Sequence, residues 1–371
     1  GVGGAGGNAI NDMIESNITT VEFIAINTDQ QDLDRSKATS KVLLGRGTGA
    51  GADPEKGRSA ARDSEDKIKE VLEGTDMLFI TAGMGGGTGT GASPIIAEVA
   101  KSMGILTVAV VTKPFSFEGP IKKNNALAGI KNLKENVDTL IAIPNDKLFE
   151  IPGMNITLLN AFKEANGILK IGIKGISDLI MKQGTINLDF ADIRSIMQNS
   201  GIAMLGFGEA NGDEKAKSAT AQALNSPLLE KSIEGARKIL INITGGPDVS
   251  LNEVNEVANT VTAKAGSEPN LIWGYILDEE LEGTISVSIV ATDFQDNLHS
   301  NIQENNNSKT VRFAPEIKKE EIKPLSSEEE KQQKSDIFSE KDENQKKDFD
   351  DEDEDDDDSM SDFVLPPFFQ E

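Results

Sequence analysis

The segment "TAGMGGGTGTGAS", residues 81–93, places six glycines between Gly83 and Gly91. Glycine loses more backbone freedom on folding than any other residue, so this density needs a physical reason. The segment follows a predicted strand at 76–82 and precedes a predicted helix at 93–103. Backbone N–H groups at a helix N-terminus bind anions, so the loop predicts a phosphate site. It contains no lysine, so the charge of a triphosphate would have to be balanced by the amides and a bound cation.

A second glycine-rich segment, "GVGGAGGNA" (1–9), leads into a helical pattern that begins near Asn8. Its G-x-G-x-x-G spacing is typical of dinucleotide folds, and Asp29 lies where a ribose-binding carboxylate would belong. An NAD-dependent oxidoreductase is therefore one hypothesis. A pyrophosphate needs only one such loop, whereas two loops suggest a longer phosphate chain held from two sides. The structural alternative, glycines required only by packing, is favoured for one short motif but not for two with correct flanks.

Apolar runs and helical patterns alternate along the first 145 residues. The runs at 21–27, 76–82, 105–111 and 138–144 resemble buried parallel strands, and a helix opens at Asp53-Pro54-Glu55. This alternation predicts a doubly wound α/β sheet. Helical spacing over 155–184 predicts one long helix. Strand patterns at 202–210, 237–244, 270–277 and 284–292 then predict a smaller α+β region, in which Ser250 and Glu253 have capping-box spacing.

The charge of the chain is concentrated in its tail. The net charge is −25, and the residues after Phe294 include 24 acidic and 10 basic side chains. An acidic surface argues against binding to nucleic acid or anionic lipid. There is no cysteine, no apolar run of the roughly 18 residues that a membrane span needs, and no secretory signal, so we expect a cytoplasmic protein. The chain begins with Gly1 inside a motif, which suggests that its natural start is missing.

Several longer motifs identify a family. "GGGTGTG" (85–91) and "GVGGAGGNA" (1–9) occur together with "NTDQQDL" (27–33), "GAGADPEKGR" (49–58), "KPFSFEG" (113–119), "IPNDKL" (143–148) and "NLDFADIRSIM" (187–197). With these motifs the chain closely resembles bacterial members of the tubulin/FtsZ family, GTPases that polymerise into the cytokinetic ring. The resemblance runs from residue 1 to about 294 and resumes at the C-terminal peptide.

The resemblance implies a domain plan. It consists of a Rossmann-like GTP-binding domain at 1–154 without its N-terminal strand, a central helix at 155–184, and an α+β C-terminal domain at 185–294. A disordered acidic linker at 295–360 and a partner-docking peptide at 361–371, "SDFVLPPFFQE", would follow. The peptide ends in Gln370-Glu371, where the family usually has a basic end.

The resemblance also assigns nucleotide-binding residues. The α- and β-phosphates would contact Gly3, Gly4, Ala5, Gly6, Gly7 and Asn8, and the β- and γ-phosphates Gly85, Gly86, Gly87, Thr88, Gly89, Thr90 and Gly91. Ala50, Gly51 and Ala52 would sense the γ-phosphate. Glu118 would bind ribose, Asn145 and Asn166 would read the guanine edge, and Phe162 would stack on the base. Lys122 stands where the family usually has arginine, and lysine lacks the planar two-pronged donor.

Asp189 and Asp192 are the candidate catalytic residues. Three residues apart at a helix start, they share one face, and from spacing alone helix capping is the favoured interpretation. The resemblance reverses this preference. It implies that both acids, with Asn187, reach the γ-phosphate of the neighbouring subunit and orient the attacking water. Hydrolysis would then be activated by head-to-tail polymerisation.

The cofactors and partners follow from the same resemblance. We expect GTP as substrate, Mg²⁺ held by the phosphates, K⁺ as a further candidate cation, and no protein metal ligands. Expected partners are other copies of the chain, and membrane tethers and division regulators at 361–371, with no nucleic acid and no direct membrane insertion. The expected location is the mid-cell division ring. The alternatives are a plasmid-segregation filament GTPase, a nucleotide-binding regulator that never polymerises, and the NAD-dependent oxidoreductase.

Overall fold

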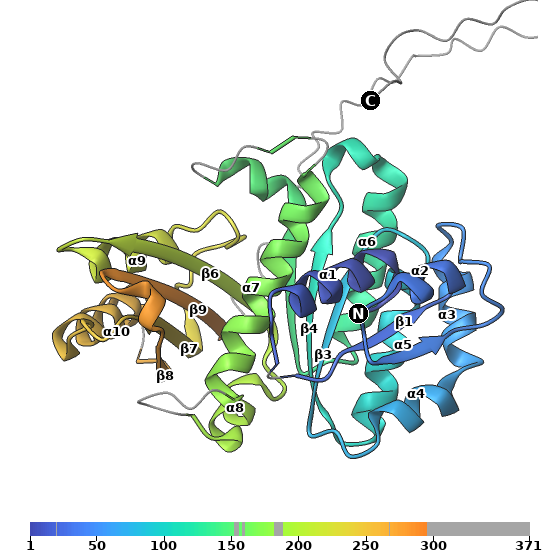
Figure 1. The fold of residues 1–371 in the computed structure, drawn as a ribbon, viewed down its shortest axis with the longest axis horizontal. Coiled ribbons are helices and arrows are strands. Elements are labelled where there is room, and N and C mark those ends of the chain that lie inside the picture. Colours follow the sequence, from blue (N-terminus) through green and yellow to red (C-terminus); the bar gives the residue numbers. More distant parts are fainter. Residues whose placement is uncertain (20, 152–155, 158–159, 182–187, 267, 295–371) are drawn as a thin grey trace, which may run out of the picture. The chain divides into compact units, whose positions relative to one another are not determined.

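The structure, a computed structural model, describes residues 1–294 except 20, 152–155, 158–159, 182–187 and 267 (Figure 1). Strands and helices alternate over its first half. The strands are β1 (Ile24–Asn27), β2 (Ser40–Leu43), β3 (Met77–Gly83), β4 (Leu106–Lys113) and β5 (Thr139–Pro144). The helices are α1 (Gly3–Glu15), α2 (Gln30–Arg35), α3 (Pro54–Arg62), α4 (Glu65–Leu72), α5 (Thr88–Ser102) and α6 (Pro120–Lys134), with short 3₁₀ turns η1 (Ser116–Glu118) and η2 (Asn145–Glu150).

A long helix leads into the second half. This helix, α7 (Ala161–Met181), is followed by α8 (Phe190–Met197). The remaining elements are β6 (Gly201–Asn211), α9 (Lys215–Leu224), β7 (Ala236–Gly245), α10 (Leu251–Ala265), β8 (Asn270–Leu277), η3 (Glu279–Leu281) and β9 (Thr284–Phe294).

Seven of the described strands form one sheet in the order β3-β4-β5-β6-β9-β7-β8. Strands β3 to β6 are parallel, whereas β9 runs antiparallel to both β6 and β7. The parallel pair β1-β2 forms a second sheet, and Val2 makes single parallel bridges to Ile26 of β1 and Ala82 of β3. The predicted α/β fold is confirmed.

The alternating residues of β4 divide the core of the first half into two layers. Val108 and Val110 belong to the core formed with α1 and α7, whereas Ala109 and Val111 belong to the core formed with α4, α5 and α6. Successive strand residues point to opposite faces, so each face of this sheet is covered by helices. In the second half, α9 and α10 cover one face and α7 packs against the other, as Figure 1 shows.

All eight segments expected to be strands are strands, and the two glycine-rich helix starts differ from expectation. Helix α5 begins at Thr88 rather than at residue 93, and α1 begins at Gly3 rather than near Asn8. Glycine's poor helix propensity predicted loops there, but close packing of these turns overrides propensity. Strand β2 was not expected, since only Val42 of its four residues is buried.

The long helix also starts later than its spacing predicted. Ile156 and Thr157 are not helical, and α7 begins at Ala161. The remaining residues at the two ends of the predicted helix are 155, 158–159 and 182–184, and they lie outside the described residues. The predicted linker and docking peptide also lie outside them.

Candidate functional site

The two glycine-rich segments meet at the starts of α1 and α5. A Cβ atom added to Gly3 would lie 3.0 Å from the backbone nitrogen of Gly89 and 3.2 Å from Cβ of Thr88. Gly3 also has φ +69°, a conformation that favours glycine. The first N–H groups of a helix have no partner within it, so two adjacent helix starts form a candidate anion site. The predicted phosphate-binding residues 3–8 and 85–91 are therefore brought together.

Close packing explains some glycines of the second segment and not others. A Cβ at Gly87 would lie 2.6 Å from Cβ of Ala50, and one at Gly89 would lie 2.6 Å from the carbonyl oxygen of Gly83. A Cβ at Gly86 would meet no atom of the described residues within 4 Å. The packing hypothesis thus accounts for Gly87 and Gly89, while Gly86 faces open space next to the helix start.

The segment expected to sense the γ-phosphate lies against the second glycine segment. Ala50 is buried beneath Gly87, whereas Gly51 and Ala52 are exposed. Both exposed residues have a left-handed backbone conformation, with φ +57° for Gly51 and φ +61° for Ala52. A left-handed alanine costs roughly 1–2 kcal/mol, and such strain is often found at ligand-binding loops.

A hydroxyl pair joins the end of β1 to the start of α5. The Oγ1 atoms of Thr28 and Thr88 lie 2.6 Å apart, and Thr28 is buried. Sequence reasoning did not single out Thr28, although it lies inside the quoted motif at 27–33. Asp29, the carboxylate of the NAD hypothesis, is the N-cap of α2 and accepts a hydrogen bond from the N–H of Gln31 at 2.9 Å.

The expected ribose-binding residue lies after β4. One carboxylate oxygen of Glu118 accepts the N–H of Phe115 at 2.9 Å, and the other accepts Nζ of Lys122 at 3.0 Å. The Glu118 side chain is 13% exposed and that of Lys122 is 45% exposed. Lys122 therefore directs its single ammonium group at Glu118.

The three expected guanine-contacting residues lie on η2 and α7. Phe162 is half-exposed, and its ring stands edge-on to that of Phe115 at a centroid distance of 5.7 Å. Asn145 is buried, and its Oδ1 has no hydrogen-bond partner among the described residues. Asn166 donates to Oδ2 of Asp12 on α1 at 3.1 Å. Sequence reasoning missed Asp12, which its position four residues after Asn8 could have indicated.

Asp189 and Asp192 form a capping box at the start of α8. The N–H of Asp192 donates to Oδ1 of Asp189 at 2.8 Å, and the N–H of Asp189 donates to Oδ2 of Asp192 at 3.3 Å. The capping interpretation is thus confirmed as geometry, and each carboxylate uses one oxygen in the box. The third candidate, Asn187, lies outside the described residues.

The glycine segments lie at the carboxyl ends of the parallel strands, and α8 lies at their amino ends. We call these two opposite edges of the sheet the glycine edge and the α8 edge. The second glycine segment follows the carboxyl end of β3, where the N–H of Met84 donates to Thr112 near the end of β4. In contrast, the last turn of α8 lies at the amino end of β5, where the hydroxyl of Thr139 donates to the carbonyl of Met197. Helix α7 runs from the first edge to the second, and its 21 residues span about 30 Å. Figure 1 shows α8 beside the far end of α7.

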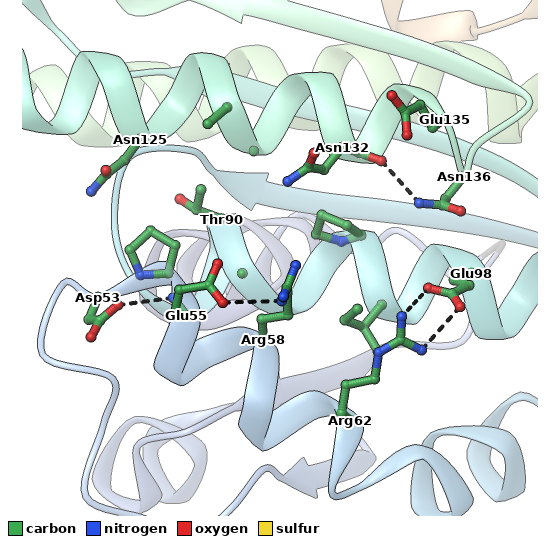
Figure 2. Close-up of a pocket in the computed structure, with 16 residues that line it drawn as sticks. Asp53, Glu55, Arg58, Arg62, Thr90, Glu98, Asn125, Asn132, Glu135 and Asn136 are labelled. Atoms are coloured by element: carbon green, nitrogen blue, oxygen red, sulfur yellow. Dashed lines mark hydrogen bonds and ion pairs between the residues drawn. The ribbon is translucent and has the colours of Figure 1, made fainter.

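A polar groove of 480 Å³ lies between α3, α5 and α6 (Figure 2). Arg58 and Arg62 line it from α3, and Asn132 and Asn136 line it from α6. It shares Thr90 and Gly91 with the second glycine segment, but none of the residues expected to contact ribose or base lines it. We therefore place the candidate site at the helix starts and not in this groove.

Two properties of the described residues bear on other functions. They contain no group of three or more histidine, aspartate or glutamate side chains placed to hold a metal ion. None of their helices is both long and apolar enough to cross a membrane.

Comparisons with known proteins agree on one relationship. Residues 1–153 match the GTPase domain of the Tubulin/FtsZ family, and residues 201–295 match the C-terminal domain of the FtsZ family. An FtsZ dimer from M. jannaschii is 47% identical, with a TM-score of 0.76 over 79% of this chain and 86% of that one. CetZ2 from Haloferax volcanii, solved as a GTPγS-bound protofilament, is 22% identical, with a TM-score of 0.68 over 81% of this chain and 94% of that one. The second likeness concerns the fold alone.

Proposed function

The chain belongs to the tubulin/FtsZ family of GTPases, and we propose that it hydrolyses GTP at a site shared by two consecutive copies in a head-to-tail filament. One copy binds GTP between the starts of α1 and α5. The next copy supplies Asp189 and Asp192 from its α8. The observation that carries the proposal is the separation of these two halves at opposite edges of the sheet, joined by α7.

The separation makes assembly a condition for catalysis. Within one copy, the glycine segments and α8 lie at opposite edges of the sheet, so they cannot both contribute to the same site. Stacking the α8 edge of one copy on the glycine edge of another completes the site. The stacked pair then has one free edge at each of its two ends. Such a contact does not close on itself and therefore generates a filament. The solved M. jannaschii relative is a dimer, which supports assembly between copies of this chain.

Within the shared site, each group has a defined task. The N–H groups of residues 3–8 and 85–91 bind phosphate oxygens, and residues 50–52 lie where a γ-phosphate would contact them. Mg²⁺ bound to the phosphates, with K⁺ as a further candidate, offsets the remaining charge. Asp189 and Asp192, with Asn187, orient the attacking water, since phosphoryl transfer depends on positioning and electrostatics more than on covalent chemistry.

The nucleoside is held by the segments that follow β4 and β5 and by α7. Glu118 binds ribose, Phe162 stacks on guanine, and Asn145 and Asn166 read its edge. Among the described residues, Oδ1 of Asn145 has no hydrogen-bond partner, and this supports the assignment, because a buried acceptor without a donor is uncommon.

The wider role follows from the family. We propose the domain plan 1–154, 155–184, 185–294, 295–360 and 361–371, with the last segment docking to membrane tethers and division regulators at the division ring. A plasmid-segregation filament is the second candidate and shares the same GTPase chemistry. The C-terminal peptide favours division.

Two signals measured on one sample test the proposal. With GTP and Mg²⁺, light scattering should rise above a threshold protein concentration, and phosphate release per copy should rise at the same threshold. With GDP, scattering should stay at the baseline. Phosphate release that is proportional to protein concentration, with no threshold, would contradict a shared site.

A further inference from the structure

We infer that Asp146 is a positioning residue, which holds the segment after β4 in the shape that presents Glu118 and Phe117 to the nucleoside. The inference rests on the proposed function, because it deepens the ribose- and base-binding part of that site. Asp146 lies on η2, next to the expected guanine contact Asn145.

The carboxylate of Asp146 binds the neighbouring segment twice. Its Oδ1 accepts the N–H of Ser116 at 2.8 Å, and its Oδ2 accepts the hydroxyl of the same residue. The sheet brings the two together, because Lys113 at the end of β4 pairs with Pro144 at the end of β5. The segments that follow both strands therefore leave the sheet side by side, and Asp146 joins them.

Ser116 stands at the centre of the segment that makes the contacts. Glu118 folds back to accept the N–H of Phe115, which fixes the short turn η1 around Ser116. Phe117 is 56% exposed and stacks on Phe115, with ring centroids 5.0 Å apart. Phe117 also stands edge-on to Phe162 at 6.4 Å, so the two exposed rings lie where a base would enter.

The consequence is a division of labour in the site. Asp146 touches neither ribose nor base; it sets the position of the two residues that do. Hydrogen bonds to a charged acceptor are among the stronger ones in proteins, so loss of Asp146 would release the turn. An asparagine at this position retains an acceptor for the N–H of Ser116 and offers an NH₂ group to its hydroxyl, which can accept. An asparagine at position 146 therefore separates the effect of the hydrogen-bond geometry from the effect of the carboxylate charge.

The test compares the dissociation constants for GDP and for 2′,3′-dideoxy-GDP, which lacks the ribose hydroxyls. Using diphosphates instead of GTP avoids polymerisation during the measurement. We expect Asp146→Ala to weaken GDP binding about tenfold and to reduce the preference for GDP over the dideoxy analogue. Asp146→Asn should restore both quantities. Ser116→Ala, which removes only the hydroxyl donor, should produce a smaller change in the same direction.

Asp138→Ala is the matched control. Asp138 also accepts two hydrogen bonds, from the backbone N–H groups of Thr107 at 2.9 Å and Asn199 at 3.2 Å, but at the opposite edge of the sheet. It should lower stability without changing the preference for GDP. An unchanged preference in Asp146→Ala, a loss that Asp146→Asn does not restore, or an equal loss in Asp138→Ala would overturn the inference. A wild-type protein that binds no GDP would instead contradict the proposed function itself.

Discussion

The glycines between Gly83 and Gly91 differ in what surrounds them. A Cβ at Gly91 would lie 1.9 Å from the carbonyl oxygen of Pro54, so this glycine lets α3 and α5 approach closely. Gly86 has open space around it, and its bare backbone is available to a ligand. At the scale of single residues, one motif therefore combines a packing requirement with the proposed phosphate-binding role.

Two substitutions separate these requirements. Gly86→Asp places a carboxylate in the open space where we expect phosphate, so it should abolish GTP binding and leave the melting temperature within a few degrees of wild type. Gly89→Ala forces a methyl group against the carbonyl of Gly83 and should destabilise the fold by about 1–3 kcal/mol. Thermal unfolding and nucleotide titration measure both effects. Normal GTP binding by Gly86→Asp would argue against the phosphate assignment, and Gly86→Ala controls for the loss of glycine.

Asp192 has both a structural and a proposed catalytic role, and substitutions can distinguish them. Asp192→Asn keeps an oxygen that can accept the N–H of Asp189, so the capping box survives. Asp192→Ala loses that bond and should lose up to about 1 kcal/mol of stability. Both variants should bind GTP and polymerise, and both should hydrolyse it roughly 100-fold more slowly than wild type. Phosphate release at saturating GTP measures this, and normal turnover in either variant would remove Asp192 from the mechanism.

At the scale of elements, α7 defines the architecture. Its residues pack against the first-half sheet on one side and against strands β7, β8 and β9 on the other, so the core containing Ile173 and Ile176 is shared. Helix α7 also contacts α1 through the hydrogen bond from Asn166 to Asp12. A rigid element about 30 Å long thus fixes the glycine edge relative to the α8 edge.

The sequence predicted elements better than it predicted their ends and contacts. Period-2 and continuous apolar runs identified every strand except β2, whose pattern is too short and too exposed to stand out. The starts of α1 and α5 were placed too late, because glycine content alone cannot show that a neighbouring element will hold it in a helix. The pairings of Thr28 with Thr88 and of Asp12 with Asn166 link residues far apart in sequence, and only the fold brings them together.

An ion pair between a buried lysine at the start of α9 and a partly exposed aspartate predicts a pH dependence. Lys215 is buried and pairs with Asp248, and this bond holds the pKa of the Asp248 carboxyl below its ordinary value of 3.8. A carboxyl with a lowered folded-state pKa contributes stability above its unfolded pKa, and this contribution is lost as pH falls through the folded value. Asp248→Asn should therefore be less stable than wild type at pH 7, and the difference should shrink below about pH 4. Urea unfolding at pH 7 and pH 3 measures it; a difference that is unchanged between these values would contradict the assignment.

At the scale of the whole molecule, the proposal makes each copy an incomplete enzyme. The glycine edge binds the substrate, the α8 edge supplies the acids, and neither edge of one copy can reach the other. Turnover then reports assembly, so GTP consumption and filament disassembly are coupled through the same contact. The acidic residues after Phe294 and the peptide at 361–371 would connect this cycle to partners without taking part in it.

Mixing two inactive variants tests the shared site most directly. Gly86→Asp keeps Asp189 and Asp192 but cannot bind GTP, whereas Asp192→Asn binds GTP but lacks the acid. Each alone should release phosphate at the background rate. An equimolar mixture should release it well above the sum of the two, because the α8 of one variant completes the site on the other. A mixture no more active than that sum, with both variants folded and Asp192→Asn binding GTP, would contradict the account.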